Sequence, residues 1–102
     1  MEISAIKDKC QDETIEVTQP MLRRLQQRHI TYCEVKEAIL QGEIIEEYPT
    51  DFPYPSCLIL GVTIAGQILH VVAGLSETKL WLVTAYIPDS AEWDAACRTR
   101  KG

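Results

Sequence analysis

Two different spacings of apolar residues divide the chain near Gly42. Before Gly42, apolar residues recur every three or four positions, as on one face of a helix. After it, apolar and polar residues alternate or form short apolar runs rich in β-branched and aromatic residues, which is typical of strands. The pattern predicts helices followed by a sheet, which is an α+β fold.

The N-terminal part is predicted to hold one short helix and one short extended segment. Ile3, Ile6 and Cys10 lie at helical spacing, which indicates a helix over residues 2–11. The stretch "TIEVT", residues 14–18, alternates, and we expect either a short strand or an extended lead-in to the next helix.

Two further helices have recognisable starts. Thr18 can cap a helix over residues 19–28. In "ITYCEV", Thr31 at the N-cap and Glu34 at the third helical position form a capping box. The helix that this box starts is expected to end at Gly42, because glycine readily takes the backbone conformation that terminates helices.

The part after Gly42 predicts four strands. They are "EIIEEY", "SCLILGVTI", "QILHVVAGL" and "LWLVTAYI", separated by turn residues. Because short connections favour neighbours in space, we expect one antiparallel four-stranded sheet with the helices packed on one face. The 102 residues form a single domain, and Trp93 is expected to anchor the segment after the last strand onto this sheet.

His70 lies in the middle of an otherwise apolar strand, and the register of its hairpin decides which way it faces. A two-residue turn at Ala65-Gly66 would place Gly61 opposite His70, on the face that the helices leave open. A bulged turn with Gly66 in the left-handed region would instead place Leu60 opposite it, on the apolar side of the sheet. We favour the first register because it separates apolar from mixed residues more cleanly.

The last strand could bring polar groups beside this histidine. Thr84 and Tyr86 share one face of that strand, and together with His70 and a helix arginine they could bind a polar ligand or support acid–base chemistry on a phosphodiester. The alternative is a structural histidine that is half buried and hydrogen-bonded to a neighbouring hydroxyl or carbonyl.

Charge is unevenly distributed along the chain. The net charge of −5 argues against a protein that coats nucleic acid. Locally basic patches are nevertheless present, and they can hold phosphates or form solvated surfaces. The basic residues concerned are Arg23, Arg24, Arg28, Arg98, Arg100 and Lys101. Residues 43–51 carry four acids and no base, which makes this an acidic edge.

Several classes of protein do not fit the sequence. The 4 cysteines form no C-x-x-C pair, and neither of the 2 histidines has a metal-ligand spacing to them, so we expect no metal and no cofactor. Reduced thiols are typical of the cytoplasm. We find no apolar run of about 20 residues and no signal peptide, and we expect a cytoplasmic protein without a membrane contact. No feature indicates specificity for DNA.

Longer stretches carry a family resemblance. "EVKEAILQGEIIEEYPTDFPYPSCLILG", "ILHVVAG" and "LVTAYIPDSAEWD" resemble the bacterial domain-of-unknown-function family numbered 4258. The likeness covers residues 18–101 and leaves 1–17 as a variable N-terminal helix and lead-in. It implies the fold group of barnase, EndoU, colicin and RelE, whose members are often metal-independent ribonucleases. Some, like MqsR, are toxins paired with an antitoxin protein.

The resemblance also implies roles for individual residues. His70, Arg28 and Tyr86 match family positions and are implied to be catalytic, with Arg98 and Arg100 matching its basic end as phosphate-holding residues. We add two neighbours, Arg24 and Thr84, as substrate-binding candidates. One position departs from the family: where members often open the first long helix with His-Ala, this chain has Pro20-Met21, which would weaken catalysis if that histidine takes part.

Two hypotheses follow from the sequence. The first is a toxin-type endoribonuclease-like domain that cleaves RNA without a metal and is held by an antitoxin-like protein. The second is a non-enzymatic protein-interaction module of the same fold that uses the acidic edge 43–51. Fold analogy alone does not choose between them, because unrelated functions share folds.

Overall fold

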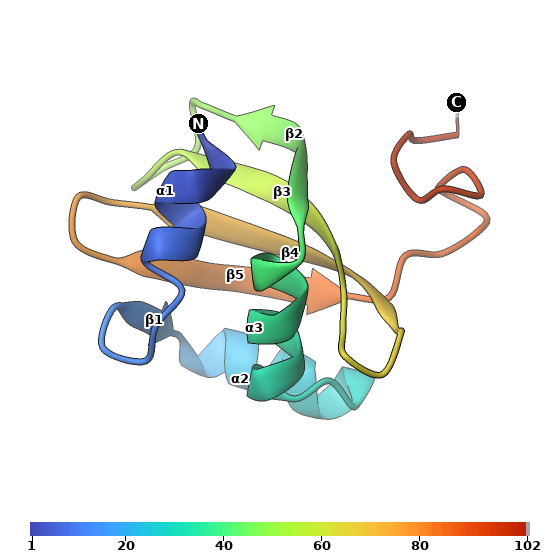
Figure 1. Ribbon diagram of the computed structural model, residues 1–102, viewed down its shortest axis with the longest axis horizontal. Helices are drawn as coiled ribbons and strands as arrows, with labels where there is room; N and C mark the ends of the chain where they lie inside the picture. The colour runs from blue at the N-terminus through green and yellow to red at the C-terminus, as the bar shows by residue number, and fades with distance from the viewer. Residues whose placement is uncertain (102) are drawn as a thin grey trace.

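The computed structural model describes residues 1–101 as one layered α+β unit (Figure 1). The α+β class predicted from the sequence is confirmed. In chain order the elements are α1 (Ile3–Asp8), β1 (Ile15–Val17), α2 (Gln19–Arg28), α3 (Tyr32–Leu40), β2 (Glu43–Tyr48), β3 (Ser56–Val62), β4 (Ile68–Leu75) and β5 (Leu80–Tyr86).

The sheet has five strands in the order β1-β5-β4-β3-β2. Strands β2 to β5 form the predicted antiparallel meander. The prediction of a purely antiparallel four-stranded sheet was wrong, because β1 adds a fifth strand parallel to β5, with Ile15 opposite Leu80. The chain leaving α1 passes the edge of β5 in an extended conformation, and pairing there satisfies backbone groups that would otherwise lack partners.

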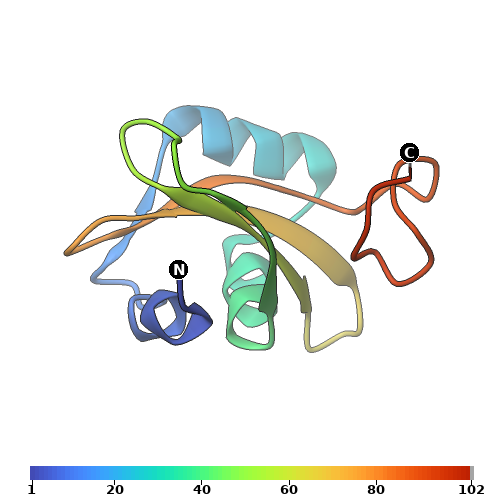
Figure 2. The same ribbon diagram turned by 90° about the horizontal axis from the view of Figure 1, so that it is seen from above.

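Two helices cover one face of the sheet. Figure 2 shows α1 and α3 side by side on this face. Their buried residues, including Ile6, Val35 and Ile39, join one core with Ile59 and Val71 from the sheet. Gly61 lies directly against Ala38 of α3, where a Cβ atom would collide with the helix backbone.

The remaining helix, α2, runs beside β5 along the part of its edge that β1 leaves free. Figure 2 shows α2 across β5 from α1 and α3, so the expectation that all helices share one face was wrong for α2. Met21 and Leu25 still reach the common core, which explains why α2 closes the edge of the sheet instead of lying on it. Thr18 caps its start, as predicted, and the capping box of Thr31 and Glu34 starts α3.

The β3–β4 hairpin adopts the register that we disfavoured. Leu60 lies opposite His70, and Gly61 lies opposite Leu69. The turn is closed by Thr63, whose N–H donates to the Gln67 carbonyl at 2.9 Å. Gly66 has a φ of +91°, so a left-handed glycine lengthens the turn by one residue. Because Gly61 faces α3, its neighbour Leu60 and His70 face away from α1 and α3, so this register does not place His70 on the side where it was expected.

The chain after β5 folds back over the sheet face opposite α1 and α3. We call residues 87–101 the C-terminal segment. Trp93 is 1% exposed and anchors this segment, as predicted, and an isolated bridge joins Trp93 to Arg100. The segment contains no helix and consists mainly of turns and bends. It converts a sheet face that the helices leave open into a second buried region.

Candidate functional site

His70 lies at the centre of this second buried region and is completely inaccessible to solvent. Its Nε2 atom is 2.8 Å from the carbonyl oxygen of Cys97, and its Nδ1 atom is 3.2 Å from the hydroxyl oxygen of Tyr86. A carbonyl can only accept, so Nε2 carries the proton. In the neutral ring Nδ1 then accepts from the Tyr86 hydroxyl, and both ring nitrogens are satisfied.

Aromatic rings enclose the imidazole. The ring of Trp93 meets it edge-on with centroids 4.4 Å apart, and the ring of Tyr86 does so at 5.2 Å. Burial lowers the pKa of His70 below its usual value, because the charged form loses its hydration; the Cys97 carbonyl and Glu46 oppose that effect in part. His70 is therefore a neutral histidine at neutral pH.

A carboxylate and a guanidinium border the histidine. Glu46 on β2 accepts two hydrogen bonds from Arg100, at 2.9 and 3.0 Å, and one from the Tyr48 hydroxyl at 2.6 Å. The Arg100 guanidinium lies 4.7 Å from the ring centroid of Trp93, a cation–π geometry. These residues form the His70 cluster: His70, Tyr86, Glu46, Tyr48 and Arg100.

The charges in the cluster shift its pKa values in opposite directions. The Arg100 hydrogen bonds hold the pKa of Glu46 below its usual range, against the opposing effect of burial. Burial, followed by the hydrogen bond to Glu46, raises the pKa of Tyr48 to about 12. Glu46 is consequently an ionised acceptor and Tyr48 a hydroxyl donor at neutral pH, with a neutral imidazole nearby.

Two arginines of α2 contact the open edge of β5. Arg24 donates to the Val83 carbonyl at 3.1 Å, and Arg28 donates to the Ala85 carbonyl at 2.8 Å and to the Thr84 hydroxyl at 2.9 Å. Residues four apart on a helix thus meet carbonyls two apart on a strand. Both guanidinium groups remain exposed and uncompensated by a carboxylate in these contacts, so each keeps its positive charge at the surface.

The acidic edge is largely neutralised within the chain. Glu43 pairs with Arg98, Glu46 with Arg100, and Glu47 with the amino group of Met1 at 2.6 Å. The C-terminal segment and the N-terminus therefore both contact β2, and fewer free carboxylates remain on this edge than the sequence suggests.

The structure brings together some of the predicted site residues. His70, Tyr86 and Arg100 meet in the His70 cluster, while Arg28 contacts Thr84, two positions before Tyr86 on β5. Arg98 lies apart from this group on Glu43, and Arg24 lies farther along β5 at Val83.

The sequence analysis did not identify Glu46 and Tyr48 as site residues. Their spacing could have indicated that their side chains lie together, because residues two apart on a strand share a face. The β-bulge between Ile44 and Glu46 hid it, since the bulge changes which residues of β2 face the histidine.

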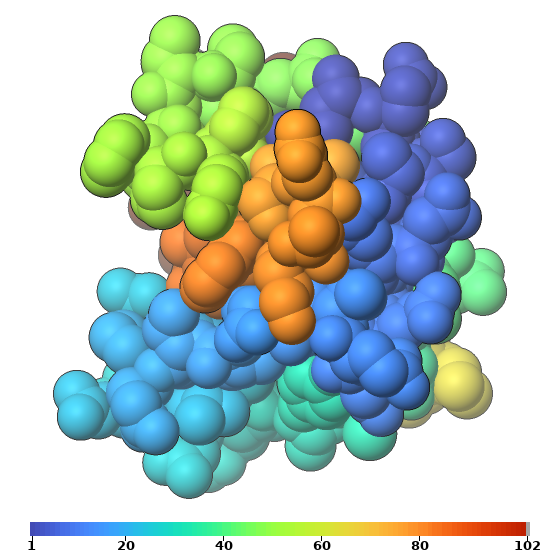
Figure 3. Space-filling view, turned by 90° about the vertical axis from the view of Figure 1, so that its left-hand side faces the viewer, coloured from blue at the N-terminus to red at the C-terminus, as the bar shows by residue number. Residues whose placement is uncertain are grey.

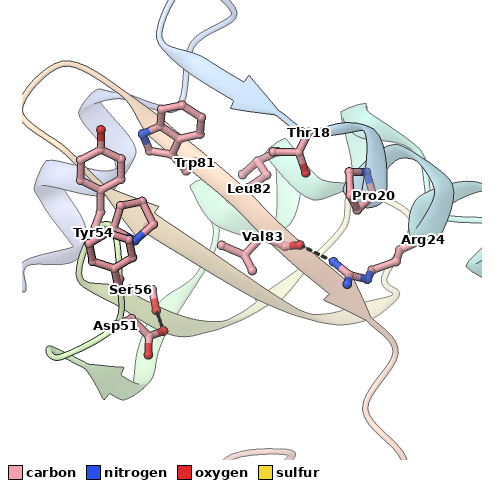
Figure 4. A pocket seen from close by; sticks show the side chains of 12 residues that line it. Thr18, Pro20, Arg24, Asp51, Tyr54, Ser56, Trp81, Leu82 and Val83 are labelled. Carbon is pink, nitrogen blue, oxygen red and sulfur yellow. Dashed lines mark hydrogen bonds between the residues drawn. The ribbon is translucent and has the colours of Figure 1, made fainter.

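A separate hollow lies on the same side of the sheet, between the β2–β3 loop and the start of α2 (Figure 3). Its cavity volume is about 560 Å³. We call it the aromatic groove; it is lined by Thr18, Pro20, Arg24, Asp51, Phe52, Pro53, Tyr54, Ser56, Gly74, Trp81, Leu82 and Val83. Figure 4 shows Tyr54 and Trp81 at one end and Arg24 at the other.

Metal-binding clusters and membrane-spanning helices are both absent from the part of the chain that the structure describes. Over residues 1–101, no group of three or more His, Cys, Asp or Glu side chains could hold a metal ion. In the same part of the chain, no helix is long and apolar enough to cross a membrane. The four cysteines are free thiols, and burial raises the pKa of Cys57 to about 11.

The fold defines a small α+β domain with a buried histidine cluster on its sheet. The family model described as "Domain of unknown function (DUF4258)" matches residues 17–87, so the chain belongs to this family. No curated protein and no solved structure gave a match. The matched region includes His70, Tyr86 and the aromatic groove, and it ends at Ile87, the first residue of the C-terminal segment.

Proposed function

We propose that this protein is a toxin-type endoribonuclease that cleaves RNA without a metal, with the His70 cluster as its acid–base site. The observation that supports this most is the convergence of a neutral imidazole, an ionised carboxylate, a tyrosine hydroxyl and a guanidinium on one face of the sheet. These groups are the kinds that phosphodiester cleavage by an internal 2′-hydroxyl requires.

The proposed reaction balances with protein groups alone. A base, Glu46 or His70, takes the proton of the ribose 2′-hydroxyl as its oxygen attacks phosphorus. The bond from phosphorus to the 5′-oxygen breaks, and the same group, now protonated, returns the proton to that leaving oxygen. Arg28 and Arg100 would offset the charge that develops on the phosphoryl oxygens, and Tyr86 would position the phosphate.

The C-terminal segment must move before RNA can reach His70. Trp93 covers the imidazole, and the Cys97 carbonyl accepts the hydrogen bond that its Nε2–H donates. We therefore propose that the described conformation is the closed state of the enzyme, and that RNA or a partner selects an open state. The family resemblance supports an antitoxin-like protein as that partner, and a cytoplasmic location for both.

The experiment is cleavage of a panel of RNAs by the purified full chain, in the presence of EDTA. We expect cleavage that leaves 2′,3′-cyclic phosphate ends and that falls by about 10²–10⁴-fold in His70→Ala. Arg28→Ala should also lose activity, whereas Arg23→Ala, an exposed neighbour on the same helix, should keep it. Cleavage that is equal in wild type and His70→Ala would remove the His70 cluster from the mechanism.

A second candidate function is binding of a protein through the acidic edge 43–51. The observation in its favour is that β2 is an outer strand, whose free backbone edge could accept an added strand. The ion pairs of Glu43, Glu46 and Glu47 within the chain weaken the electrostatic part of this hypothesis. Absence of RNA cleavage, together with a partner whose binding is lost when Ile45→Pro blocks the β2 edge, would favour it.

A further inference from the structure

We propose that the aromatic groove is a nucleotide-binding subsite, in which a base of single-stranded RNA packs on Tyr54 and Trp81 while its phosphate contacts Arg24. The inference rests on the proposed function for the choice of RNA as the ligand, but it concerns binding and not cleavage. The groove lies outside the His70 cluster, and its volume of about 560 Å³ is in the range of small-molecule sites.

The aromatic end of the groove is already arranged for stacking. The rings of Tyr54 and Trp81 are stacked, with centroids 5.6 Å apart and planes 20° from parallel. Phe52, on the same loop, is 95% exposed, although a large apolar side chain normally avoids such exposure. Three aromatic residues at one end of a hollow offer the flat apolar surfaces on which unpaired bases stack in single-strand binding proteins.

An unsatisfied polar atom lies in the same place. Among residues 1–101, the Nε1 atom of Trp81 is the buried side-chain polar atom that has no hydrogen-bond partner. Buried N–H groups are rarely left without an acceptor, so this one requires an explanation. Figure 4 shows the atom on the side of the ring nearest Tyr54. A carbonyl oxygen of a base that packs on the Tyr54 ring, at the edge of the Trp81 ring, would supply the acceptor.

The charges of the groove favour one orientation of the bound nucleotide. Arg24 lies at one end, where its guanidinium donates to the neutral carbonyl of Val83 and keeps its positive charge (Figure 4). Asp51 lies at the opposite end, where it accepts from the Ser56 hydroxyl. An anionic group is therefore attracted to the Arg24 end and repelled from the aromatic end, which matches a nucleotide with its base on Trp81 and its phosphate toward α2.

The groove and the His70 cluster lie along the same two strands, β4 and β5, on the same face of the sheet. Trp81 and Gly74 form one cross-strand pair, Tyr86 and His70 another, and both pairs face away from α1 and α3. Gly74 and His70 lie four positions apart on β4, which corresponds to roughly 13 Å along the strand. Arg28 contacts Thr84 between the two sites. An RNA strand anchored in the groove would thus pass the α2 arginines on its way to His70.

The test is binding of a fluorescent 2′-O-methyl RNA hexamer to the full chain, measured by anisotropy. This RNA lacks the attacking hydroxyl, so the experiment reports binding even if the protein cleaves nothing. We expect Tyr54→Ala to weaken binding by about tenfold or more, as for loss of one stacked base. Arg24→Gln should weaken it and reduce the salt dependence by about 0.7, the slope expected for one phosphate of a single strand.

The matched controls separate this site from general charge effects. Arg23→Gln removes the same charge from the neighbouring position of α2, outside the groove, and should leave the affinity and the salt slope nearly unchanged. A sugar-phosphate hexamer without bases should bind about tenfold or more weakly than the RNA.

Three results would each overturn the assignment: no binding of RNA, equal binding of the baseless hexamer, or equal effects of Arg23→Gln and Arg24→Gln. A groove that instead binds a proline-rich peptide, with RNA unable to displace it, would also overturn it. Cleavage without groove binding would reject the subsite alone, and binding without cleavage would reject the nuclease proposal alone.

Discussion

At the residue scale, His70 shows how a polar group can be buried in an apolar strand. Each ring nitrogen has a partner of the appropriate kind, a carbonyl for the donor and a hydroxyl for the acceptor. That arrangement matches the structural alternative that the sequence left open. A histidine so placed fixes the C-terminal segment to the sheet, and under our proposal it becomes an acid–base group only when that segment opens.

The buried neutral histidine should make stability depend on pH. Its pKa is lowered in the folded state, so between that value and the ordinary value near 6.5 the unfolded chain binds more protons. The histidine's contribution to stability is therefore complete above about pH 6.5 and is lost as pH falls toward the folded pKa.

Denaturant unfolding of wild type and His70→Gln from pH 5 to pH 8 measures this contribution. The wild type should lose more stability on acidification than the variant does, because glutamine does not titrate, while nearby Glu46 and Arg100 are present in both proteins. Parallel pH profiles of the two proteins would contradict the assignment of a lowered pKa to His70.

His29 illustrates backbone strain at a helix end. It follows α2 with a φ of 56°, in the left-handed region where glycine is usual, and the next N–H, of Ile30, donates to the Leu25 carbonyl at 2.9 Å. His29→Gly should raise the free energy of unfolding by about 1 kcal/mol, because a side chain is costly in this conformation. Thermal unfolding measures the gain, and His29→Ala, which keeps a Cβ atom, should not reproduce it.

At the element scale, local signals predicted more than long-range pairings did. The capping box at Thr31, the cap at Thr18 and the four meander strands followed from short sequence patterns and are confirmed. The pairing of β1 with β5 joins residues 65 apart in the chain, Ile15 and Leu80, and no local pattern specifies it.

The predicted register of the β3–β4 hairpin was wrong for a similar reason. A single left-handed glycine, Gly66, shifts every pair of β3 and β4 by one residue, and the sequence allowed either turn. The burial of His70 could not be foreseen either, because it depends on Trp93 and Cys97 of a segment without regular structure.

The contact between α3 and β3 gives a prediction for these elements. A Cβ atom at Gly61 would collide with the backbone of Ala38, which cannot shift without moving α3. Gly61→Ala should therefore lower the free energy of unfolding by about 1–3 kcal/mol, the usual cost of overpacking. Gly74→Ala is the matched control, since its nearest contact would be an ordinary 3.6 Å. Equal losses in the two variants, measured by chemical denaturation, would contradict the close packing of α3 on β3.

At the scale of the whole molecule, Met1 and the C-terminal segment both contact the acidic strand β2. Met1 reaches Glu47, and the C-terminal segment reaches Glu43 and Glu46 through its arginines. Although the net charge of the chain is −5, the three glutamates of β2 are each paired with a positive group at this edge. The arginines of α2, next to the aromatic groove, form no ion pair within residues 1–101, and under our proposal they would contact RNA.

Arg100 should control how readily the C-terminal segment opens. It joins this segment to Glu46 by two hydrogen bonds and to the Trp93 ring by a cation–π contact. In Arg100→Gln, we expect the backbone amides of Asp94 and Lys101 to exchange with deuterium several-fold faster, while those of β4 stay protected. Arg98→Gln is the control, because its pair with Glu43 is exposed on both sides and contributes little. Unchanged exchange in Arg100→Gln would show that other contacts hold the segment.

The central claim, that the His70 cluster is an acid–base site for RNA, is tested most directly by the rate of RNA cleavage in EDTA by wild type and His70→Gln. Both proteins are first shown to be folded by circular dichroism. The account predicts cleavage by the wild type and a rate lower by about 10²–10⁴-fold in the variant. Equal rates, or no cleavage by the folded wild type on any RNA of the panel, would contradict it.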